Sequence, residues 1–307
     1  MSTSKKRRYD YVLLESMDLF INWLDQDPRD FNVKDMTNDL ELQYAYIGKC
    51  EKLVEIGFLE RAGNRRGTYR KRDHRANKMD LVNVLTDPMD IWLPFGISDL
   101  VEIYPGNLIM IAGAKSSGKT ALMLNIIKEN RHKFNHVHYF NSEMGAAELR
   151  KRLDKFDGLT IDMWLESFTA YSRSENFGDV IRPGQGNLNI IDFLEIHDEF
   201  YVIGKELKKI HNRLNGAIAI VGLQKNPGQD VGLGGWRSME VTRLALALDW
   251  GKVKITEAKN YRKPDVNPRG LCKDFQIIHG CQIIDRGRWY KKENGKESEA
   301  SHEANTD

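Results

Sequence analysis

The chain has 307 residues, which is enough for two domains with buried cores. Its 46 lysines and arginines against 44 acidic residues leave it nearly neutral, so any affinity for nucleic acid must come from local clusters. Cys50, Cys272 and Cys281 lack metal-ligand spacing and are expected to be reduced, packed thiols. No apolar run is long enough for a membrane span and the basic N-terminus lacks a signal-peptide core, so we expect a cytoplasmic protein without membrane contact.

The N-terminal segment has the pattern of a small α+β module. Apolar periodicity predicts helices at 11–24, 31–39 and 42–56, and two short segments, 58–61 and 68–70, predict a β-hairpin. Three helices followed by a hairpin resemble the order of elements in a winged helix-turn-helix. That family binds nucleic acid, and it also serves as a dimerisation or docking module.

Basic side chains cluster on this module although the whole chain is nearly neutral. The hairpin and the stretch after it carry a run of cations that is opposed within the run by Asp73 alone. Such a cluster concentrates affinity for phosphates, so duplex DNA is the expected partner. The expected contacts are Tyr44, Lys49, Lys52, Arg65, Arg66, Arg70, Lys71 and Arg72. The alternative is a solvated charged loop on a protein-docking domain.

A phosphate-binding signature, G-x-x-x-x-G-K-T, follows an expected connector at 81–94. The apolar run 108–112 predicts a buried strand before it, and the helical run 121–128 leaves it. Backbone N–H groups and a helix N-terminus attract a polyphosphate, with Lys119 reaching the β- and γ-phosphates and Thr120 holding Mg²⁺. The ligands expected here are ATP and Mg²⁺; the alternative is an ordinary Gly/Ser loop. The predicted nucleotide-binding residues are Gly113, Ala114, Lys115, Ser116, Ser117, Gly118, Lys119, Thr120 and Ala121.

Beyond this signature, strands alternate with helices. Strands are predicted at 136–141, 167–170, 188–194 and 217–224, with helices at 146–156 and 200–214. This alternation predicts an α/β domain with a mainly parallel sheet. The apolar run ending at Asp192 suits a carboxylate that holds Mg²⁺ through water, and a turn-capping aspartate is the alternative.

Several of these stretches, taken in order, resemble the RecA-like ATPases and, within them, the motor domain of DnaB-type replicative helicases. The resemblance covers about 95–290 and rests on PGNLI before Gly113, GKTALMLNI from Gly118, NSEM at 141–144 and the helical AELRKRL that follows. It implies a RecA-like fold, contact with DNA, and ATP bound between the subunits of a homo-oligomer. In place of that family's N-terminal helical domain, this sequence has the winged-helix candidate.

The resemblance also implies catalytic roles. By position Glu143 matches the residue that orients the attacking water, and the alternative is that it caps the helix beginning near Ala146. Gln224 matches a polar sensor of the γ-phosphate. Lys259 and Arg262 match basic fingers that reach the ATP of a neighbouring subunit, although their spacing is one residue longer than in the helicases.

The glycine-rich loop 225–237 matches the mobile segment that grips single-stranded DNA in that family. The expected contacts are Lys225, Trp236 and Arg237, and the alternative is a surface loop with Trp236 packed in the core. A closing hairpin is predicted from 275 to 290, with turns at 279–280 and 285–287, before a polar tail expected to be disordered.

Together these patterns predict an α/β fold: a RecA-like P-loop core with a mainly parallel sheet, plus a small winged-helix domain. The expected domains are 1–80, a connector at 81–94, the ATPase at 95–291 and the tail at 292–307. The expected function is that of a DNA-binding ATPase in replication, recombination or mobile-element biology, and a helicase is one form that such an ATPase takes. An ATP-switched initiator, helicase loader or regulator is the alternative, and a protein-docking scaffold is a more distant one.

Overall fold

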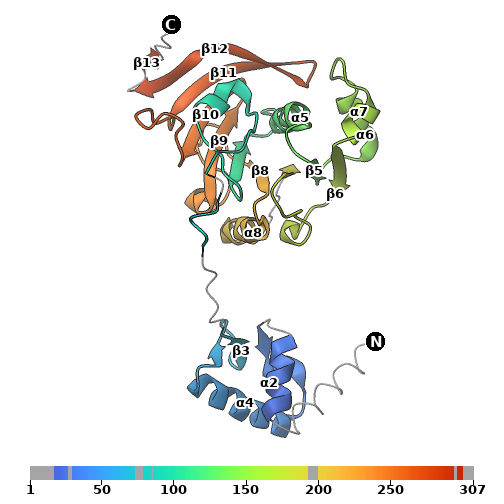
Figure 1. Ribbon diagram of the computed structural model, residues 1–307, viewed down its shortest axis with the longest axis vertical. Helices are drawn as coiled ribbons and strands as arrows, with labels where there is room; N and C mark the ends of the chain where they lie inside the picture. The colour runs from blue at the N-terminus through green and yellow to red at the C-terminus, as the bar shows by residue number, and fades with distance from the viewer. Residues whose placement is uncertain are drawn as a thin grey trace. The chain divides into compact units, whose positions relative to one another are not determined.

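The computed structural model describes residues 17–26, 30–72, 79–84, 86–192, 200–293 and 296–299. The chain divides into two units, Met1–Val84 and Leu85–Asp307, each with its own hydrophobic core. Figure 1 shows the elements of each unit, which are described separately below. No helix in the described ranges is long and apolar enough to cross a membrane.

The N-terminal unit packs helices against a small antiparallel sheet. In chain order its elements are α2 (Met17–Gln26), β1 (Phe31–Asn32), α3 (Val33–Met36), α4 (Leu40–Glu55), β2 (Leu59–Arg61) and β3 (Thr68–Lys71). The strand order is β1-β3-β2. The core contains Phe20, Leu24, Tyr46, Cys50, Leu53, Leu59 and Tyr69. The helices predicted at 11–24 and 42–56 and the predicted hairpin are confirmed over their described residues. Residues 11–16 lie outside the described ranges.

The helix predicted at 31–39 is wrong over most of its length. Phe31 and Asn32 pair with Tyr69 and Thr68 as a strand, and only Val33–Met36 is helical. The Asn32 side chain accepts a hydrogen bond from the Lys34 backbone N–H (2.9 Å) and donates one to Thr68 Oγ1 (2.6 Å). Asparagine thus ends the strand and caps the helix, because its short side chain bonds to nearby backbone groups outside a helix.

The C-terminal unit is built on a 10-stranded sheet, in the described residues, of order β13-β12-β11-β10-β9-β4-β8-β7-β5-β6. The strands from β9 to β6 run parallel, and β10 to β13 extend them as antiparallel strands (Figure 1). The parallel strands are β4 (Leu108–Gly113), β5 (His136–Asn141), β6 (Phe168–Ser172), β7 (Asn187–Asp192), β8 (Ile218–Gln224) and β9 (Thr242–Asp249). The others are β10 (Lys252–Ala258), β11 (Leu271–Ile278), β12 (Gln282–Glu293) and β13 (Lys296–Glu299). The predicted α/β class with a mainly parallel sheet is confirmed.

Two hydrophobic layers cover this sheet. One cluster joins the sheet to α5 (Lys119–Asn130), α6 (Ala146–Leu153) and α7 (Ile161–Leu165). A second cluster joins its other face to α8 (Phe200–Arg213). Cys50, Cys272 and Cys281 are buried and form no disulfide, as predicted. With helices over both faces, the carboxyl edge of the parallel strands is left open for loops, where ligands bind in open α/β sheets.

Two expectations for the C-terminal strands are wrong. The turn at 279–280 exists, but residues 285–287 lie inside β12, where Gly287 has φ 72° beside a shift in the pairing of β11 with β12. This glycine accommodates an irregularity in the strand rather than a reversal of the chain. The disordered tail predicted at 292–307 is wrong for its described residues, because β12 continues to Glu293 and pairs with β13. Residues 294–295 and 300–307 lie outside the described ranges.

Candidate functional site

The phosphate loop connects the fully buried strand β4 to α5. Ser116 has φ 60° and Gly118 has φ 96°, so the backbone turns twice through the left-handed region. A Cβ on Gly113 would lie 2.5 Å from Lys119 Cγ and 2.6 Å from Ser117 Oγ. Any side chain at that position would therefore fill the space around which the loop is wrapped. The loop has the local geometry that the signature predicts.

Lys119 bends back over the loop. Its ammonium donates hydrogen bonds to the carbonyl oxygens of Gly113 (3.1 Å) and Ala114 (3.3 Å). Burial lowers the pKa of Lys119, and the charges of Asp192 and Glu143 oppose this shift. Nearby, Ser117 Oγ is buried without a hydrogen-bond partner among the described residues. An unpartnered hydroxyl beside a cation and a glycine cradle fits an anionic oxygen as ligand.

Asp192, at the end of β7, lies beside Thr120. The aspartate is 3% exposed, and it accepts hydrogen bonds from the Thr120 side chain and from the Tyr139 hydroxyl (2.7 Å). Burial raises the pKa of Asp192, and these two hydrogen bonds oppose the shift. The Thr120 hydroxyl, at the start of α5, and the Asp192 carboxylate, at the end of β7, are the kinds of oxygen donor that Mg²⁺ takes in phosphate-loop proteins. The turn that follows Asp192, residues 193–199, lies outside the described ranges.

Tyr139 was not singled out from the sequence, although a signal was present. It lies in β5, the strand that pairs with β7, and β5 ends at Asn141 opposite Asp192. A hydroxyl-bearing residue so close to that end was a candidate partner for the aspartate. Burial raises the pKa of Tyr139, so its hydroxyl remains a donor that orients the carboxylate.

Glu143 lies in the turn that follows β5. The Asn141 side-chain oxygen accepts the N–H groups of Glu143 (3.2 Å) and Met144 (3.1 Å), which fixes this turn. The residue before α6 is Gly145, and no side chain caps the helix, so the interpretation of Glu143 as a helix cap is wrong. Glu143 is exposed, and its charge acts on Lys119. The structure thus brings Glu143, Lys119, Thr120 and Asp192 to one region of the edge.

Gln224 lies at the same edge, paired in register with Gly113, and its side chain is exposed. The next residue differs from expectation. Lys225 has a fully buried side chain, and its ammonium contacts the Asp249 carboxylate at 2.6 Å. The prediction that Lys225 contacts DNA is therefore wrong, because a buried ammonium paired with a carboxylate presents no charge to a phosphate.

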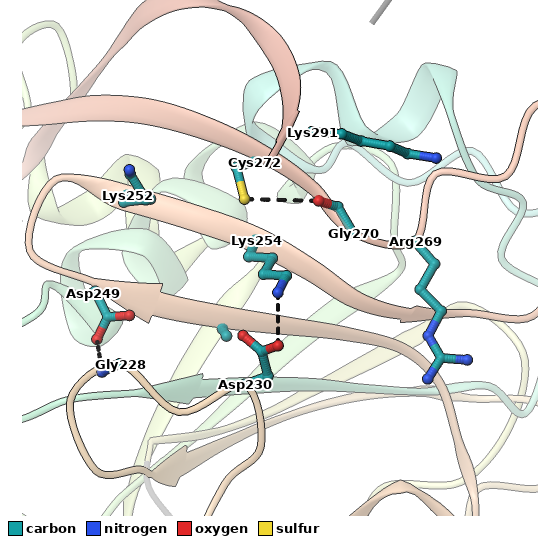
Figure 2. A pocket seen from close by; sticks show the side chains of 10 residues that line it. Gly228, Asp230, Asp249, Lys252, Lys254, Arg269, Gly270, Cys272 and Lys291 are labelled. Carbon is teal, nitrogen blue, oxygen red and sulfur yellow. Dashed lines mark hydrogen bonds and ion pairs between the residues drawn. The ribbon is translucent and has the colours of Figure 1, made fainter. Parts of the chain in front are cut away.

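Asp249 also fixes the start of the glycine-rich loop. Its carboxylate accepts the backbone N–H of Gly228 (3.3 Å), and Lys254 binds Asp230 at 2.6 Å. Figure 2 shows both interactions at the wall of a cavity of about 390 Å³, into which several cations project. Lys252 also lines this cavity and approaches the Asp274 carboxylate at 3.7 Å. The beginning of the predicted mobile loop is thus held by ion pairs and a backbone hydrogen bond.

The end of the same loop is open to solvent. Trp236 and Arg237 lie in the 3-10 helix Gly235–Met239, where both are exposed, and 68% of the tryptophan is accessible. The alternative that Trp236 packs in the core is therefore wrong. These two side chains are available to a ligand, in contrast to Lys225.

Lys259 and Arg262 lie away from the phosphate loop of their own chain. They follow β10, which starts beside Asp249 at the carboxyl edge and ends beside Leu244 at the opposite edge. Lys259 Nζ donates to the Glu240 carbonyl oxygen (3.4 Å), and Arg262 Nε donates to the Ser98 carbonyl oxygen (2.9 Å). The structure therefore does not bring these two cations together with Lys119 and Glu143 within one chain.

The cations of the N-terminal unit are more strongly neutralised than the sequence suggested. Carboxylates from other elements pair with them: Arg61 with Glu51, Arg65 with Asp35, and Arg70 and Arg72 with Glu60. Asp73 is thus not the only acid that opposes these cations, and Asp73 itself lies outside the described residues. Tyr44, Lys52 and Arg66 are exposed, Lys49 is half-buried, and Lys71 lies over the Phe58 ring. Exposed pairs of this kind contribute little free energy and exchange readily for other anions.

Comparison with known protein families finds a match for the segment that contains the phosphate loop. Residues 99–162 match the family described as DnaB-like helicase C terminal domain. No curated protein matches the chain. A solved KaiC-like protein from the hyperthermophilic archaeon Pyrococcus horikoshii OT3 is similar at 17% identity, with 65% of this chain and 98% of that chain covered and a TM-score of 0.49. A second solved structure, an ATPase domain, is similar at 17% identity, with 60% of this chain and 86% of that chain covered and a TM-score of 0.44.

The family match spans the phosphate loop, α5, β5, the Glu143 turn and α6. These are the elements that position the cation and one of the carboxylates described above. The parallel sheet around them, with helices on both faces, is the architecture that such a core requires. Within the C-terminal unit, residues 99–162 are therefore similar to the DnaB-like helicase C terminal domain, and the sheet that contains them is α/β and mainly parallel.

Proposed function

We propose that this protein is a Mg²⁺-dependent ATP hydrolase of the RecA/DnaB-like class that acts on DNA. The observation that carries the proposal is the grouping of Lys119, the Thr120–Asp192 pair and Glu143 at one edge of the sheet. A cation, an oxygen pair for a metal and a second carboxylate are the parts that phosphoryl transfer to water needs.

In this proposal each residue has a separate task. Lys119 neutralises charge on the β- and γ-phosphates, and the backbone N–H groups of the loop bind their oxygens. Thr120 and, through water, Asp192 hold Mg²⁺, which supplies charge that stabilises the transferring phosphoryl group. Glu143 orients the attacking water, and Gln224 contacts the γ-phosphate end of the site.

The position of the fingers favours an ATP site shared between subunits. Lys259 and Arg262 lie at the edge of the sheet opposite their own phosphate loop, so they are available to a neighbouring copy. A cation inserted from outside stabilises the charge that develops on the leaving γ-phosphoryl group. We therefore infer a homo-oligomer with ATP at the subunit interface.

A mixing experiment tests the shared site. Lys119→Ala and Arg262→Ala proteins, each inactive alone, are expected to regain part of the ATPase activity when mixed. One kind of mixed interface then combines an intact phosphate loop with an intact finger. Steady-state phosphate release across mixing ratios measures this recovery. The site would lie within one chain if the mixture were as inactive as its components and the parent protein, shown by sedimentation to be a monomer, hydrolysed ATP at the full rate.

The N-terminal unit, which we infer to be a winged helix, supplies the second half of the proposal. Its helices and hairpin carry exposed cations whose carboxylate partners lie at the surface, so phosphates can displace those partners at small cost. Duplex DNA is the proposed ligand, with contacts from Tyr44, Lys49, Lys52, Arg65, Arg66, Arg70, Lys71 and Arg72.

Replacing Arg65, Arg66 and Arg70 together with alanine is expected to weaken duplex binding by the full chain at low salt. Each lost phosphate contact should lower the slope of log K against log salt by about 0.9, so the slope should fall by up to about 3. Fluorescence anisotropy with a labelled duplex at several salt concentrations measures both quantities. An unchanged slope would favour the docking module, and Lys128→Ala, on α5, is the control for a general loss of charge.

An ATP-switched initiator, helicase loader or regulator is the second candidate, and the burial of Lys225 favours it. A translocating motor needs a loop that grips single-stranded DNA, and here that loop offers Trp236 and Arg237 but not Lys225. The two candidates differ in one measurable activity. A helicase displaces a strand from a forked duplex as it hydrolyses ATP, whereas a switch binds DNA in an ATP-dependent way without displacement.

A further inference from the structure

The order of the strands fixes how a nucleotide lies across the phosphate loop. Gln224 and Asp192 end β8 and β7, and Glu143 follows β5; these three strands all lie on one side of β4. The γ-phosphate must point toward these groups if they bind its metal and its attacking water. The base is at the other end of the nucleotide. It must therefore lie on the opposite side of β4, over the end of β9, the start of β10 and the end of β11.

An exposed tryptophan lies on that side. Leu248, in β9, is in register with Gly113, and its carbonyl oxygen accepts the backbone N–H of Ala114 (3.1 Å). Trp250 follows two residues later, in the tight turn between β9 and β10, and 62% of it is accessible. Among the residues that the structure describes, no aromatic ring stacks on it. A single exposed tryptophan is ordinary, but this one lies two residues after the strand position that hydrogen-bonds to the phosphate loop, on the side expected to receive the base.

The neighbours of Trp250 suit an anionic nucleotide with an apolar base. Asp249, the acid beside it, is neutralised by the buried Lys225, so it does not repel phosphates. On the next strands, the Phe275 N–H donates to the Gly251 carbonyl oxygen (2.8 Å), which places β11 beside the turn. Two residues further, Ile277 reaches the loop itself, because a Cβ on Gly118 would lie 2.2 Å from Ile277 Cδ1. The turn that carries Trp250 and the side chain of Ile277 therefore both lie on the β9 side of the phosphate loop.

We propose that Trp250 is the stacking platform for the nucleobase, with Ile277 forming the second wall. This inference rests on the proposed nucleotide site and adds the specificity of that site. Stacking depends on the π-face that every base presents, and an indole offers only one N–H donor. The site therefore prefers purines over the smaller pyrimidines and discriminates weakly between adenine and guanine.

Equilibrium binding of Mg²⁺–ADP and Mg²⁺–tripolyphosphate tests the proposal, because only the first ligand has a base. In calorimetric titrations of the full chain, Trp250→Ala is expected to bind ADP about tenfold more weakly, and up to about a hundredfold, with tripolyphosphate binding unchanged. Trp250→Phe should recover most of the ADP affinity. Leu165→Ala, which removes an exposed apolar side chain of α7, is the matched control.

Three results would overturn the proposal. If Trp250→Ala bound ADP as tightly as the parent, the base would lie elsewhere. The same conclusion would hold if the variant kept its ADP affinity and lost affinity for single-stranded DNA. An equal loss of ADP and tripolyphosphate binding in both Trp250→Ala and Trp250→Phe would show that the turn only shapes the loop. If the parent protein bound neither ligand, the nucleotide site itself would be wrong, and that result is distinct from the other two.

Discussion

Replacing Lys119 with alanine is expected to lower ATP turnover by at least about a hundredfold and to weaken Mg²⁺–ATP binding. The variant loses the only cation that the phosphate loop and the start of α5 hold against the loop carbonyls in the described structure. It also removes a cation whose charge acts on Asp192 and on Glu143. Phosphate release and calorimetric titration with a slowly hydrolysed ATP analogue measure the two effects.

The matched control is Lys128→Ala, which removes a lysine from the same helix away from the loop. It should hydrolyse ATP at the parent rate and melt at nearly the same temperature. A Lys119→Ala protein that is folded, by circular dichroism, and that turns over ATP like the parent would remove Lys119 from the mechanism.

Changing Glu143 to glutamine should separate chemistry from binding. Loss of a general base or water-orienting carboxylate costs about 10²- to 10⁴-fold in rate, so hydrolysis should nearly disappear. ATP affinity should stay the same or rise slightly, because a negative charge that acts on the Lys119 ammonium has been removed. Rapid-quench measurement of a single turnover, with saturating protein, reports the chemical step directly.

Glu148→Gln is the control for this substitution, because Glu148 is an exposed carboxylate in α6 that pairs with Arg152. It should leave both rate and affinity unchanged. If Glu143→Gln instead lowered ATP affinity as much as turnover, the carboxylate would support the turn after β5 rather than the attacking water.

The features that were predictable from the sequence are those determined locally. The phosphate loop depends on Gly113, where Lys119 and Ser117 leave no room for a side chain, and on Gly118, whose φ of 96° favours glycine, so the motif carries much of its own geometry. Strand and helix order in the core followed from apolar runs and their period. The grouping of strand ends then followed from the parallel sheet.

The wrong predictions share a non-local cause. The sequence predicts that Lys225 is an exposed cation of the loop. In the structure Asp249, which comes later in the chain, pairs with Lys225 and allows its burial. The run of arginines was expected to be unpaired charge, but Glu51 and Asp35 reach it from α4 and α3, and Glu60 pairs with Arg70 across the hairpin. Charge counted along a sequence does not show which carboxylates the fold brings alongside.

The helix predicted at 31–39 failed for a related reason. Its apolar spacing suits a helix, yet β3, which comes much later in the chain, draws Phe31 and Asn32 into a strand. Gly287 likewise reads as a turn residue but accommodates an irregular step in a paired strand. Tertiary pairing overrides local preference in both cases.

The position of β4 in the sheet has a consequence for how the protein reaches its native state. The strand before the phosphate loop lies between β8 and β9, which follow it in the chain only after α5, β5, α6, β6, β7 and α8. During synthesis its wholly apolar residues leave the ribosome long before either partner exists. High contact order makes such pairing slow and leaves strand edges open meanwhile. The earliest part of the nucleotide site to be translated is thus among the last to be completed, and a chain released before Asp249 would lack one wall of the loop.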